Sequence, residues 1–290
     1  MSPYRLALVL VAAGSSANSV NGLLLRSIEA ATEWQLVFYR SASLAVSLTF
    51  VYVFIHRRDT ARELAKLTRL SLAGSLALSA TNIGFIWSVQ HTTVANTMFM
   101  LGAIPFLTAI LARVFLKELV STRLWCSVTI AMGGVSLMVW DGIGTGTMFG
   151  NALALFTAVS FATYIVILRR GRSTDMLPVV VLGAWVSVLI SSTMANFNLV
   201  ISWHDIGLMV VWGGVLSALV HFFFTYGSRH VQGAELSLFA LLEFALAPIW
   251  VLIVFDERPS DLSLVGGTLV MLAVLAHAIV SLRPRAISTQ

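Results

Sequence analysis

Charged side chains and cysteine are what this sequence lacks most. Only 11% of its 290 residues are Asp, Glu, Lys or Arg, whereas a soluble domain carries about 25%, and 58% are hydrophobic. This number of charged groups is too small to cover the surface of a soluble fold. The composition therefore excludes a water-soluble globular protein. The single cysteine, Cys126, excludes a fold held together by internal disulfides. The sequence therefore predicts an integral membrane protein.

Long apolar runs are what the sequence has instead. A bilayer core about 30 Å thick is crossed by about 20 apolar residues in a helix, which satisfies its own backbone hydrogen bonds. Ten such runs occupy nearly all of the chain and predict an all-α integral membrane protein with ten transmembrane helices. Their approximate bounds are 4–25, 34–55, 70–89, 95–115, 124–140, 150–168, 178–197, 206–226, 236–255 and 262–282.

The positions of Lys and Arg predict the orientation of these helices. Of the 18 Lys and Arg residues, all except Arg26, Arg40 and Arg258 fall in segments on the same side of the membrane as the N-terminus. The positive-inside rule makes that side the cytoplasm. We therefore expect a multi-pass protein of the cell inner (plasma) membrane with both termini cytoplasmic. The net charge of +5 reflects this topology and contact with the lipid bilayer, and it requires no nucleic-acid partner.

One stretch of the sequence occurs twice. The segment that begins just before His91 recurs 139 residues later, so that His91 matches His230 and Glu118 matches Glu257 without a gap. Matching landmarks at one offset indicate that the chain is duplicated.

The duplication predicts two repeats of opposite orientation. We assign residues 1–145 to a first five-helix repeat and residues 146–290 to a second, with the boundary in the glycine-rich stretch 141–150. Five helices are an odd number, so the second copy enters the membrane inverted. Inverted repeats are typical of secondary transporters, whose substrate site lies near the midplane between the copies.

An arginine lies inside the second predicted helix. Arg40 is about six residues from the outer end, or roughly 9 Å deep at 1.5 Å per residue. A charge at this depth is costly unless it faces water or a partner, which favours a substrate-binding role. The alternative is that its side chain extends to the outer headgroups.

A carboxyl group lies deep in the ninth predicted helix. Glu243 is cheapest there in its neutral, protonated form until a cation or substrate arrives. This behaviour suits a group that binds an amine or carries a coupling proton. The alternative is a structural hydrogen bond made by the neutral acid.

Further candidates for the substrate site are polar and aromatic side chains at membrane depth. Asn82 and His221 occupy matching positions in the third and eighth helices, where they form either a shared cavity or ordinary interhelical hydrogen bonds. The small residues around Asn18 also favour close helix packing, and the aromatic candidates either line a pocket or pack in the core. The remaining candidates are Asn18, Tyr164, Trp185 and Phe239.

Prolines interrupt the two central helices, four and nine. Pro105 and Pro248 each remove a backbone hydrogen bond, and we expect a kink at each. Glu118 and Glu257 lie nearer the interface, where we expect capping or pairing with Lys117, Arg123 or Arg258. Trp212 is assigned, with other aromatic residues near helix ends, to an aromatic belt.

These features resemble the EamA-like branch of the drug/metabolite transporter (DMT) superfamily. The stretches that carry the resemblance are SVQHTTVANTMFMLGAIPFLTAILARVFLKE (88–118), GSRHVQGAELSLFALLEFALAPIWVLIVFDERPS (227–260) and FYRSASLA around Arg40. The resemblance implies ten helices in two inverted repeats and exchange or proton-linked movement of small metabolites such as amino acids, often export. The family's ninth helix usually reads Leu-Glu-Pro, whereas here Phe244 follows Glu243 and the proline is displaced to Pro248.

The function we expect is secondary active transport of a small polar or zwitterionic metabolite by alternating access. Arg40 would bind a carboxylate, Glu243 an amine or a proton, and Asn82, His221 and Asn18 would supply hydrogen bonds. Uptake of a vitamin or another small metabolite is the alternative. An intramembrane enzyme is a weaker alternative, because the sequence contains no HExxH motif, no paired intramembrane aspartates and no Ser in a Gly-rich elbow. We expect no catalytic residues, metal or cofactor, and a monomer or homodimer.

Overall fold

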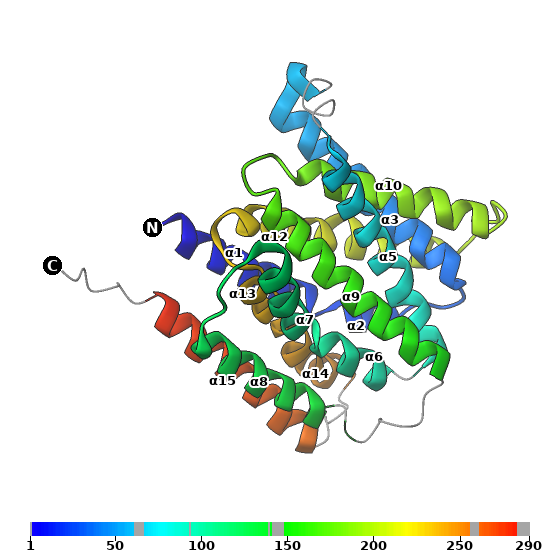
Figure 1. Cartoon of the computed structure of the whole chain (residues 1–290). Helices are drawn as coiled ribbons and strands as arrows, with labels where there is room; N and C mark the ends of the chain where they lie inside the picture. The colour runs from blue at the N-terminus through cyan, green and yellow to red at the C-terminus, as the bar shows by residue number, and fades with distance from the viewer. Residues whose placement is uncertain are drawn as a thin grey trace, which may run out of the picture.

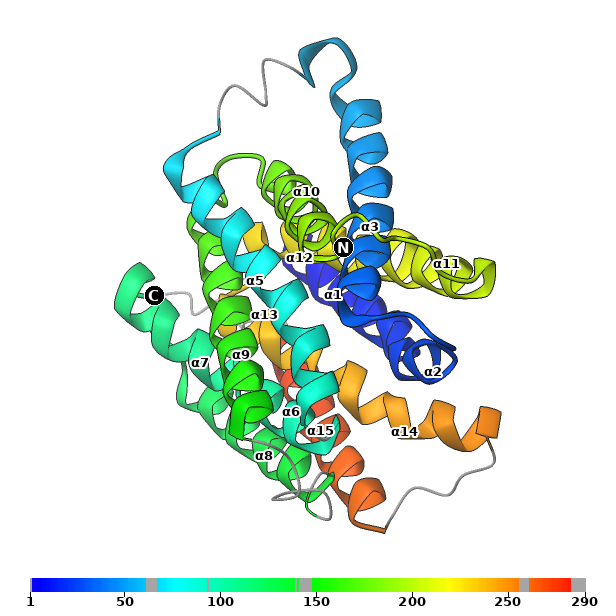
Figure 2. The ribbon, with the colours of Figure 1, turned by 90° about the vertical axis from the view of Figure 1, so that its right-hand side faces the viewer.

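The computed structural model describes residues 2–60, 67–92, 94–138, 140, 148–255 and 261–282, and these residues contain helices but no strand. Figures 1 and 2 show the helices gathered into one bundle. In the first part of the chain they are α1 (Pro3–Asn18), α2 (Asn21–Arg26), α3 (Glu33–His56), α5 (Arg69–His91), α6 (Val94–Gly102), α7 (Ile104–Leu111) and α8 (Thr122–Met138). In the second part they are α9 (Met148–Arg170), α10 (Leu177–Met194), α11 (Trp203–Met209), α12 (Ala218–His230), α13 (Gly233–Ala240), α14 (Leu242–Phe255) and α15 (Asp261–Leu282).

Short segments of other helical geometry join some of these elements. A 3-10 turn, η1 (Arg57–Asp59), follows α3, and a π-helical turn, η2 (Ala112–Leu116), ends α7. A longer π-helical segment, η4 (Val210–Ser217), connects α11 to α12. π-helical turns often occur at functional sites.

Seven helical stretches in the described part of the chain are long and apolar enough to cross a membrane. α8 is shorter, with 17 residues, and the ninth expected helix is divided into α13 and α14. Ten spans in two inverted repeats therefore stays a prediction. The seven stretches are Pro3–Leu25, Glu33–His56, Arg69–His91, Thr97–Leu116, Met148–Arg170, Leu177–Met194 and Trp203–His230.

Helices from the two parts of the chain pack against each other in pairs. α5 packs along α9, α8 along α15, and α3 along α10. α1 packs against α12, and α3 also packs against η4. The α5–α9 and α8–α15 pairs lie side by side in both views (Figures 1 and 2). The two parts therefore interlock and do not form separate bundles.

The two central helices are both broken. α6 ends at Gly102 and α7 begins at Ile104, with Pro105 in the first turn of α7, so the interruption lies at the expected proline. In the second part of the chain the interruption falls at Leu241, between α13 and α14, and α14 runs on to Phe255 through the position of Pro248. The side chain of Pro248 lies outside the described part of the structure.

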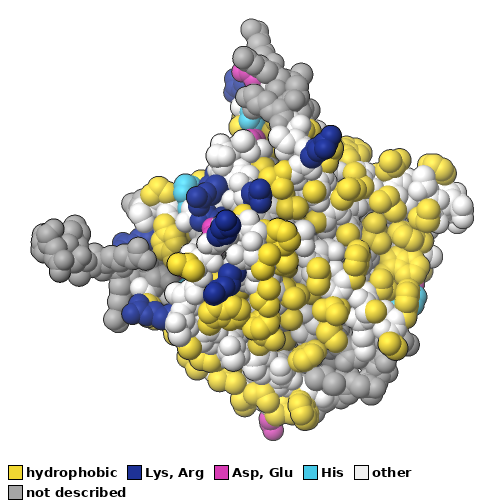
Figure 3. All heavy atoms as spheres, viewed as in Figure 1, with side chains coloured by type: hydrophobic (Ala, Val, Ile, Leu, Met, Phe, Trp, Pro, Cys, Tyr) yellow, Lys and Arg dark blue, Asp and Glu magenta, His cyan; other side chains and the backbone are white. Residues whose placement is uncertain are grey.

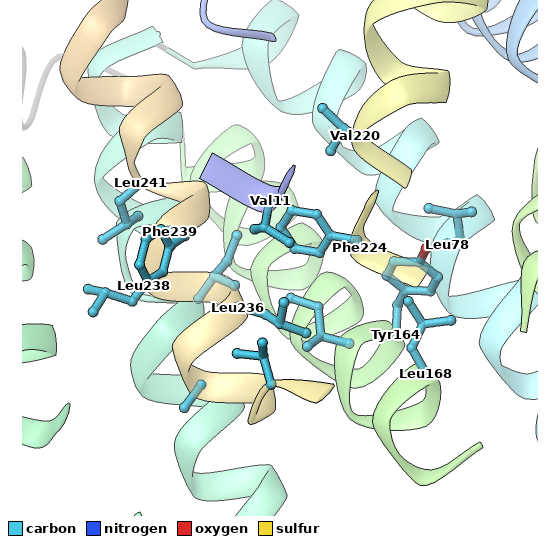
Figure 4. Close-up of a cluster of buried hydrophobic side chains, with 14 of the residues drawn as sticks. Val11, Leu78, Tyr164, Leu168, Val220, Phe224, Leu236, Leu238, Phe239 and Leu241 are labelled. Atoms are coloured by element: carbon cyan, nitrogen blue, oxygen red, sulfur yellow. The ribbon is translucent and has the colours of Figure 1, made fainter. Parts of the chain in front are cut away.

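The surface of the molecule is largely apolar. Figure 3 shows hydrophobic side chains over most of the visible face, with Lys and Arg grouped on the side where α1 begins and α15 ends. Phe50 is 73% exposed on α3, as expected for a side chain that faces lipid and not water. The interior is also apolar, and Figure 4 shows part of it around Val11 and Leu236.

The partner expected for Glu118 was wrong. Its carboxylate accepts a hydrogen bond from Nε of Arg169 at 2.7 Å, and Arg169 also donates to the carbonyl of Ser228 at 3.0 Å. The packing of η2 against α9 places Arg169 next to Glu118, although the two residues are far apart in the sequence. Glu257, Arg258 and residues 141–147 lie outside the described residues, so the expectations for them stay predictions.

Candidate functional site

A cavity lies between helices from both parts of the chain. Including the space that opens to solvent, it measures about 870 Å³. α10 contributes no lining residue, although the seventh predicted helix was expected to take part. The polar part of the wall consists of Ser15, Asn18, Asn21, Arg40, Thr81, Asn82, Thr157, Ser217, His221, Ser237 and Glu243. The aromatic part consists of Phe85, Phe161, Trp212, Phe224 and Phe244.

Arg40 brings a positive charge to this cavity. Its guanidinium donates to Oδ1 of Asn82 at 3.3 Å and to Oγ of Ser217 at 3.5 Å. Its central carbon lies 4.7 Å from the ring centroid of Trp212, which is a cation–π distance. Its Nε is buried without a hydrogen-bond partner. All of these partners are neutral, so the arginine keeps the capacity to bind an anion.

The π-helical segment η4 explains why Arg40 can lie in this position. A Cβ added at Gly213 would overlap the backbone carbonyl oxygen of Arg40, so only glycine lets η4 approach α3 this closely. The same segment carries Trp212 and Ser217, which contact the guanidinium. The assignment of Trp212 to an aromatic belt was therefore wrong, because its side chain is 1% exposed and packs over Arg40.

Glu243 brings a carboxyl group to the same cavity. It lies in the first turn of α14, directly after the interruption at Leu241. Nδ2 of Asn18 donates to its Oε2 at 2.9 Å, and Nδ2 of Asn21 donates to its Oε1. Two amide donors, one on each oxygen, suit a carboxylate at a helix N-terminus. Asn18 Oδ1 is itself buried without a partner.

Asn82 and His221 reach the cavity from helices α5 and α12. Asn82 links Arg40 to the hydroxyl of Ser187 at 3.5 Å, so its amide both accepts and donates. Nδ1 of His221 lies 3.2 Å from the hydroxyl of Tyr164. Tyr164 is fully buried and contacts the lining residues His221 and Phe161, so it supports the wall and does not line it.

Two aromatic candidates are not brought to the cavity. Trp185 is 43% exposed and donates from Nε1 to the hydroxyl of Thr49 at 3.2 Å. Phe239 is 3% exposed and packs in the apolar interior (Figure 4). Ser237 and Leu241 on the same segment do line the cavity, and a helix turns about 100° per residue. Phe239 therefore points away from the face that they share.

Asn21 is a site residue that the sequence interpretation missed. It lies in the polar stretch 14–22 of the first predicted helix, from which only Asn18 was selected. The chain leaves α1 after Asn18 and begins α2 at Asn21, so both amides reach Glu243. Two Asn residues three positions apart on one helical face were the signal that could have identified it.

Comparisons with known proteins agree with this arrangement. The EamA-like transporter family matches residues 5–140. A protein of Bacillus subtilis (strain 168) described as "Uncharacterized transporter YyaM" is 28% identical over 222 residues, which are 70% of this chain and 70% of that protein. A solved structure, described as "Crystal structure of protein", has a TM-score of 0.78 at 13% identity and covers 94% of this chain and 96% of its own. That likeness concerns the fold alone.

The apolar helices, the family match and the Bacillus relative support a multi-pass membrane transporter, which is consistent with the drug/metabolite transporter superfamily. Residues 5–140 match the EamA-like transporter family, and this part of the chain is similar to its members.

Proposed function

We propose that the chain is a secondary transporter that moves a small zwitterionic, amino-acid-like metabolite across the plasma membrane by alternating access, as an exporter or exchanger. One observation carries this proposal. The cavity holds one cationic and one acidic side chain, Arg40 and Glu243, and each is hydrogen-bonded to neutral groups and not to the other. Two opposite charges in one cavity that are not paired with each other fit a ligand that carries both a positive and a negative charge.

The chemistry of the wall assigns a place to each end of such a ligand. A carboxylate binds at Arg40, where the unpartnered Nε is an additional donor. An ammonium group binds at Glu243, where the unpartnered Oδ1 of Asn18 is a further acceptor. The aromatic side chains between these groups surround the apolar part of the ligand.

Matching helix boundaries support the proposed duplication. α6 and α13 begin at Val94 and Gly233, which are 139 residues apart, and α5 and α12 end at His91 and His230, which are separated by the same interval. The cross-packing has the same symmetry, since α5 packs on α9 as α12 packs on α1. These regularities favour ten spans in two inverted five-helix repeats.

The broken central helices support alternating access. A break frees backbone groups near a substrate site, and discontinuous helices in transporters border the site that opens to each side in turn. Here the breaks lie at Ala103 and Leu241, next to the lining residues Ile104 and Glu243. Because each break lies beside the cavity, rocking of one half against the other changes its access.

Flux measurements in proteoliposomes test the substrate class. We expect amino acids to exchange through the wild-type protein, and their carboxyl-amidated and N-acetylated analogues to compete at least tenfold more weakly. Arg40→Ala should remove the preference for the free carboxylate, and Glu243→Gln the preference for the free amine. Normal flux through both variants, with both preferences retained, contradicts the site.

Labelling of the chain ends tests the topology. We expect tags at both termini to react with impermeant reagents only from the cytoplasmic side. Ends on opposite sides of the membrane rule out the inverted repeat and the mechanism derived from it.

A further inference from the structure

A second cluster of buried ionisable groups lies outside the cavity wall. Oε1 of Glu235, on α13, accepts a hydrogen bond from the hydroxyl of Tyr4 at 2.6 Å and lies 2.9 Å from Nε2 of His277, on α15. The side chains of Glu235 and His277 are 7% and 9% exposed. None of the three residues lines the cavity. A carboxyl and an imidazole buried in direct contact are costly to assemble, and the substrate site described above does not use them.

The hydrogen bonds around His277 fit its protonated form. The hydroxyl of Ser127 donates to the carbonyl of Arg123 at 3.1 Å, and its oxygen lies 3.5 Å from Nδ1 of His277, where it can accept from a ring N–H. Nε2 faces the carboxyl oxygen of Glu235, and a carboxylate there accepts from a ring N–H. An imidazole that donates from both nitrogens carries a proton on each and is cationic.

We propose that Glu235 and His277 form a proton-binding site, separate from the substrate cavity, that couples proton movement to transport. With a neutral imidazole the cluster carries one negative charge. One proton taken from water by His277 converts the contact into an imidazolium–carboxylate ion pair of zero net charge, and release of that proton reverses the change. This inference rests on the transport function proposed above.

The position of the cluster gives it a route to the substrate. Glu235 lies in the first turn of α13, and Glu243 lies in the first turn of α14, directly after the break that follows α13. Ser237 and Ala240 on the same helix line the cavity. Tyr4 belongs to α1, in the other half of the chain. A change in charge at Glu235 therefore acts on a contact between the halves and on a helix that borders the substrate.

The surrounding helices leave His277 as the ionisable partner of Glu235. The hydrogen bonds and ion pairs of Glu235 among the described residues go to Tyr4 and His277. α7, which packs closely on α13, carries no titratable group. The other titratable groups on α13's neighbours and on α15 are Arg5, Arg123, Cys126, Tyr164, Arg169, Arg170, His221, Tyr226, Arg229, His230, Glu243 and Asp261.

Several of those neighbours are engaged elsewhere. Arg169 binds Glu118, and Arg170 binds the carbonyl of Phe115. Arg229 binds Asp175. Glu243 accepts from its two asparagines, and His221 contacts Tyr164.

Proton flux and exchange, measured separately, test the proposal. Proteoliposomes that contain a pH-sensitive dye report protons moved when an amino-acid gradient is imposed, and labelled counterflow reports exchange without net proton movement. We expect Glu235→Gln and His277→Gln to reduce substrate-driven proton flux at least tenfold while counterflow stays within about twofold of wild type. His204→Gln is the matched control, because His204 lies near Glu29 and Asp205 but is 52% exposed, and it should change neither readout.

A second measurement needs no substrate. The melting temperature of the detergent-solubilised protein is followed from about pH 5 to 8, the range in which histidine titrates. We expect Glu235→Gln, His277→Gln and the double variant to show the same reduction in the pH dependence of this temperature. Additive losses, or proton flux that persists in both single variants, overturn the proton site. Wild-type exchange with no proton flux overturns it too, and leaves the transport function intact. Absence of all flux contradicts the transport function, and the melting experiment still decides whether the pair binds a proton as one unit.

Discussion

Arg40 and Arg169 are both withdrawn from bulk water, yet they are satisfied in different ways. Arg169 forms an ion pair with Glu118 at 2.7 Å and a hydrogen bond to a backbone carbonyl, and its side chain is 9% exposed. Within the described part of the chain, the guanidinium of Arg40 binds an amide and a hydroxyl and lies over an indole ring, and it retains a buried Nε without a partner. The first arrangement holds helices together, whereas the second keeps a charge available to a ligand. The following predictions test this distinction.

Arg169→Met should have the largest effect on stability. The substitution leaves the carboxylate of Glu118 without its counter-ion, and removing one partner of a buried ion pair costs about 3–5 kcal/mol. Thermal unfolding in detergent measures the loss. Because replacing both partners removes the stranded charge, the double variant Glu118→Leu with Arg169→Met should recover most of the stability. A double variant no more stable than the single one means that the charge pair is not what holds α9 to η2.

Arg40→Met should separate activity from stability. Loss of a charge-assisted bond to the substrate carboxylate costs about 2–3 kcal/mol, or about 30- to 150-fold in affinity. The melting temperature should hold or rise, and the free energy of unfolding should change by less than about 1 kcal/mol, because no charged partner is stranded. A fall in stability as large as that of Arg169→Met removes the contrast between the two arginines.

Gly213→Ala should distort the site through the backbone. An added methyl group meets the carbonyl of Arg40, and overpacking of this kind costs about 1–3 kcal/mol. We expect lower stability and slower transport, because η4 must move away from α3. Gly207→Ala is the control, since an added Cβ there has nothing within 4 Å. Equal behaviour of the two alanine variants would show that the close approach of η4 is not needed.

Asn21→Ala should weaken the acidic end of the site alone. It removes one of two amide donors to Glu243, a bond to a charged group worth about 1.5 kcal/mol or about tenfold. The flux of amino acids should fall by about this factor. The weak binding of an N-acetylated analogue, which has no free ammonium group, should not change. If both ligands are affected equally, Asn21 acts on the cavity as a whole.

Trp185→Phe should have the smallest effect. Its indole faces outward and makes one hydrogen bond, to Thr49. We expect flux within about twofold of wild type and a stability change within about 0.5 kcal/mol. A large loss of flux would place α10 in the substrate pathway, where the structure provides no lining residue.

Much of the cavity could be predicted because ionisable and amide groups are rare in this chain. In a segment of apolar residues a single polar side chain is conspicuous, since lipid offers it no hydrogen bonds. Arg40, Asn18, Asn82, His221 and Glu243 were selected on that ground, and all five line the cavity. Their roles in binding substrate stay predictions.

Aromatic and interfacial residues could not be assigned in the same way. Lipid is as apolar as the protein interior, so the sequence of a membrane helix does not reveal which face points inward. Trp185, Phe239 and Trp212 were all placed differently by the structure, and each placement depends on the rotation of one helix. Glu235 was overlooked because a glutamate at a helix end is ordinarily solvated.

The sequence by itself determined that the chain is helical, that it lies in a bilayer and that a few polar side chains sit at membrane depth, because hydrophobic content and length decide those properties locally. Only the tertiary structure decided which charges meet. Glu118 pairs with Arg169 and Glu235 with His277 across 51 and 42 residues of chain, while Arg40 and Glu243 have no such partner among the residues that the structure describes. Pairing depends on how helices from distant parts of the chain rotate and pack, and no local pattern encodes that.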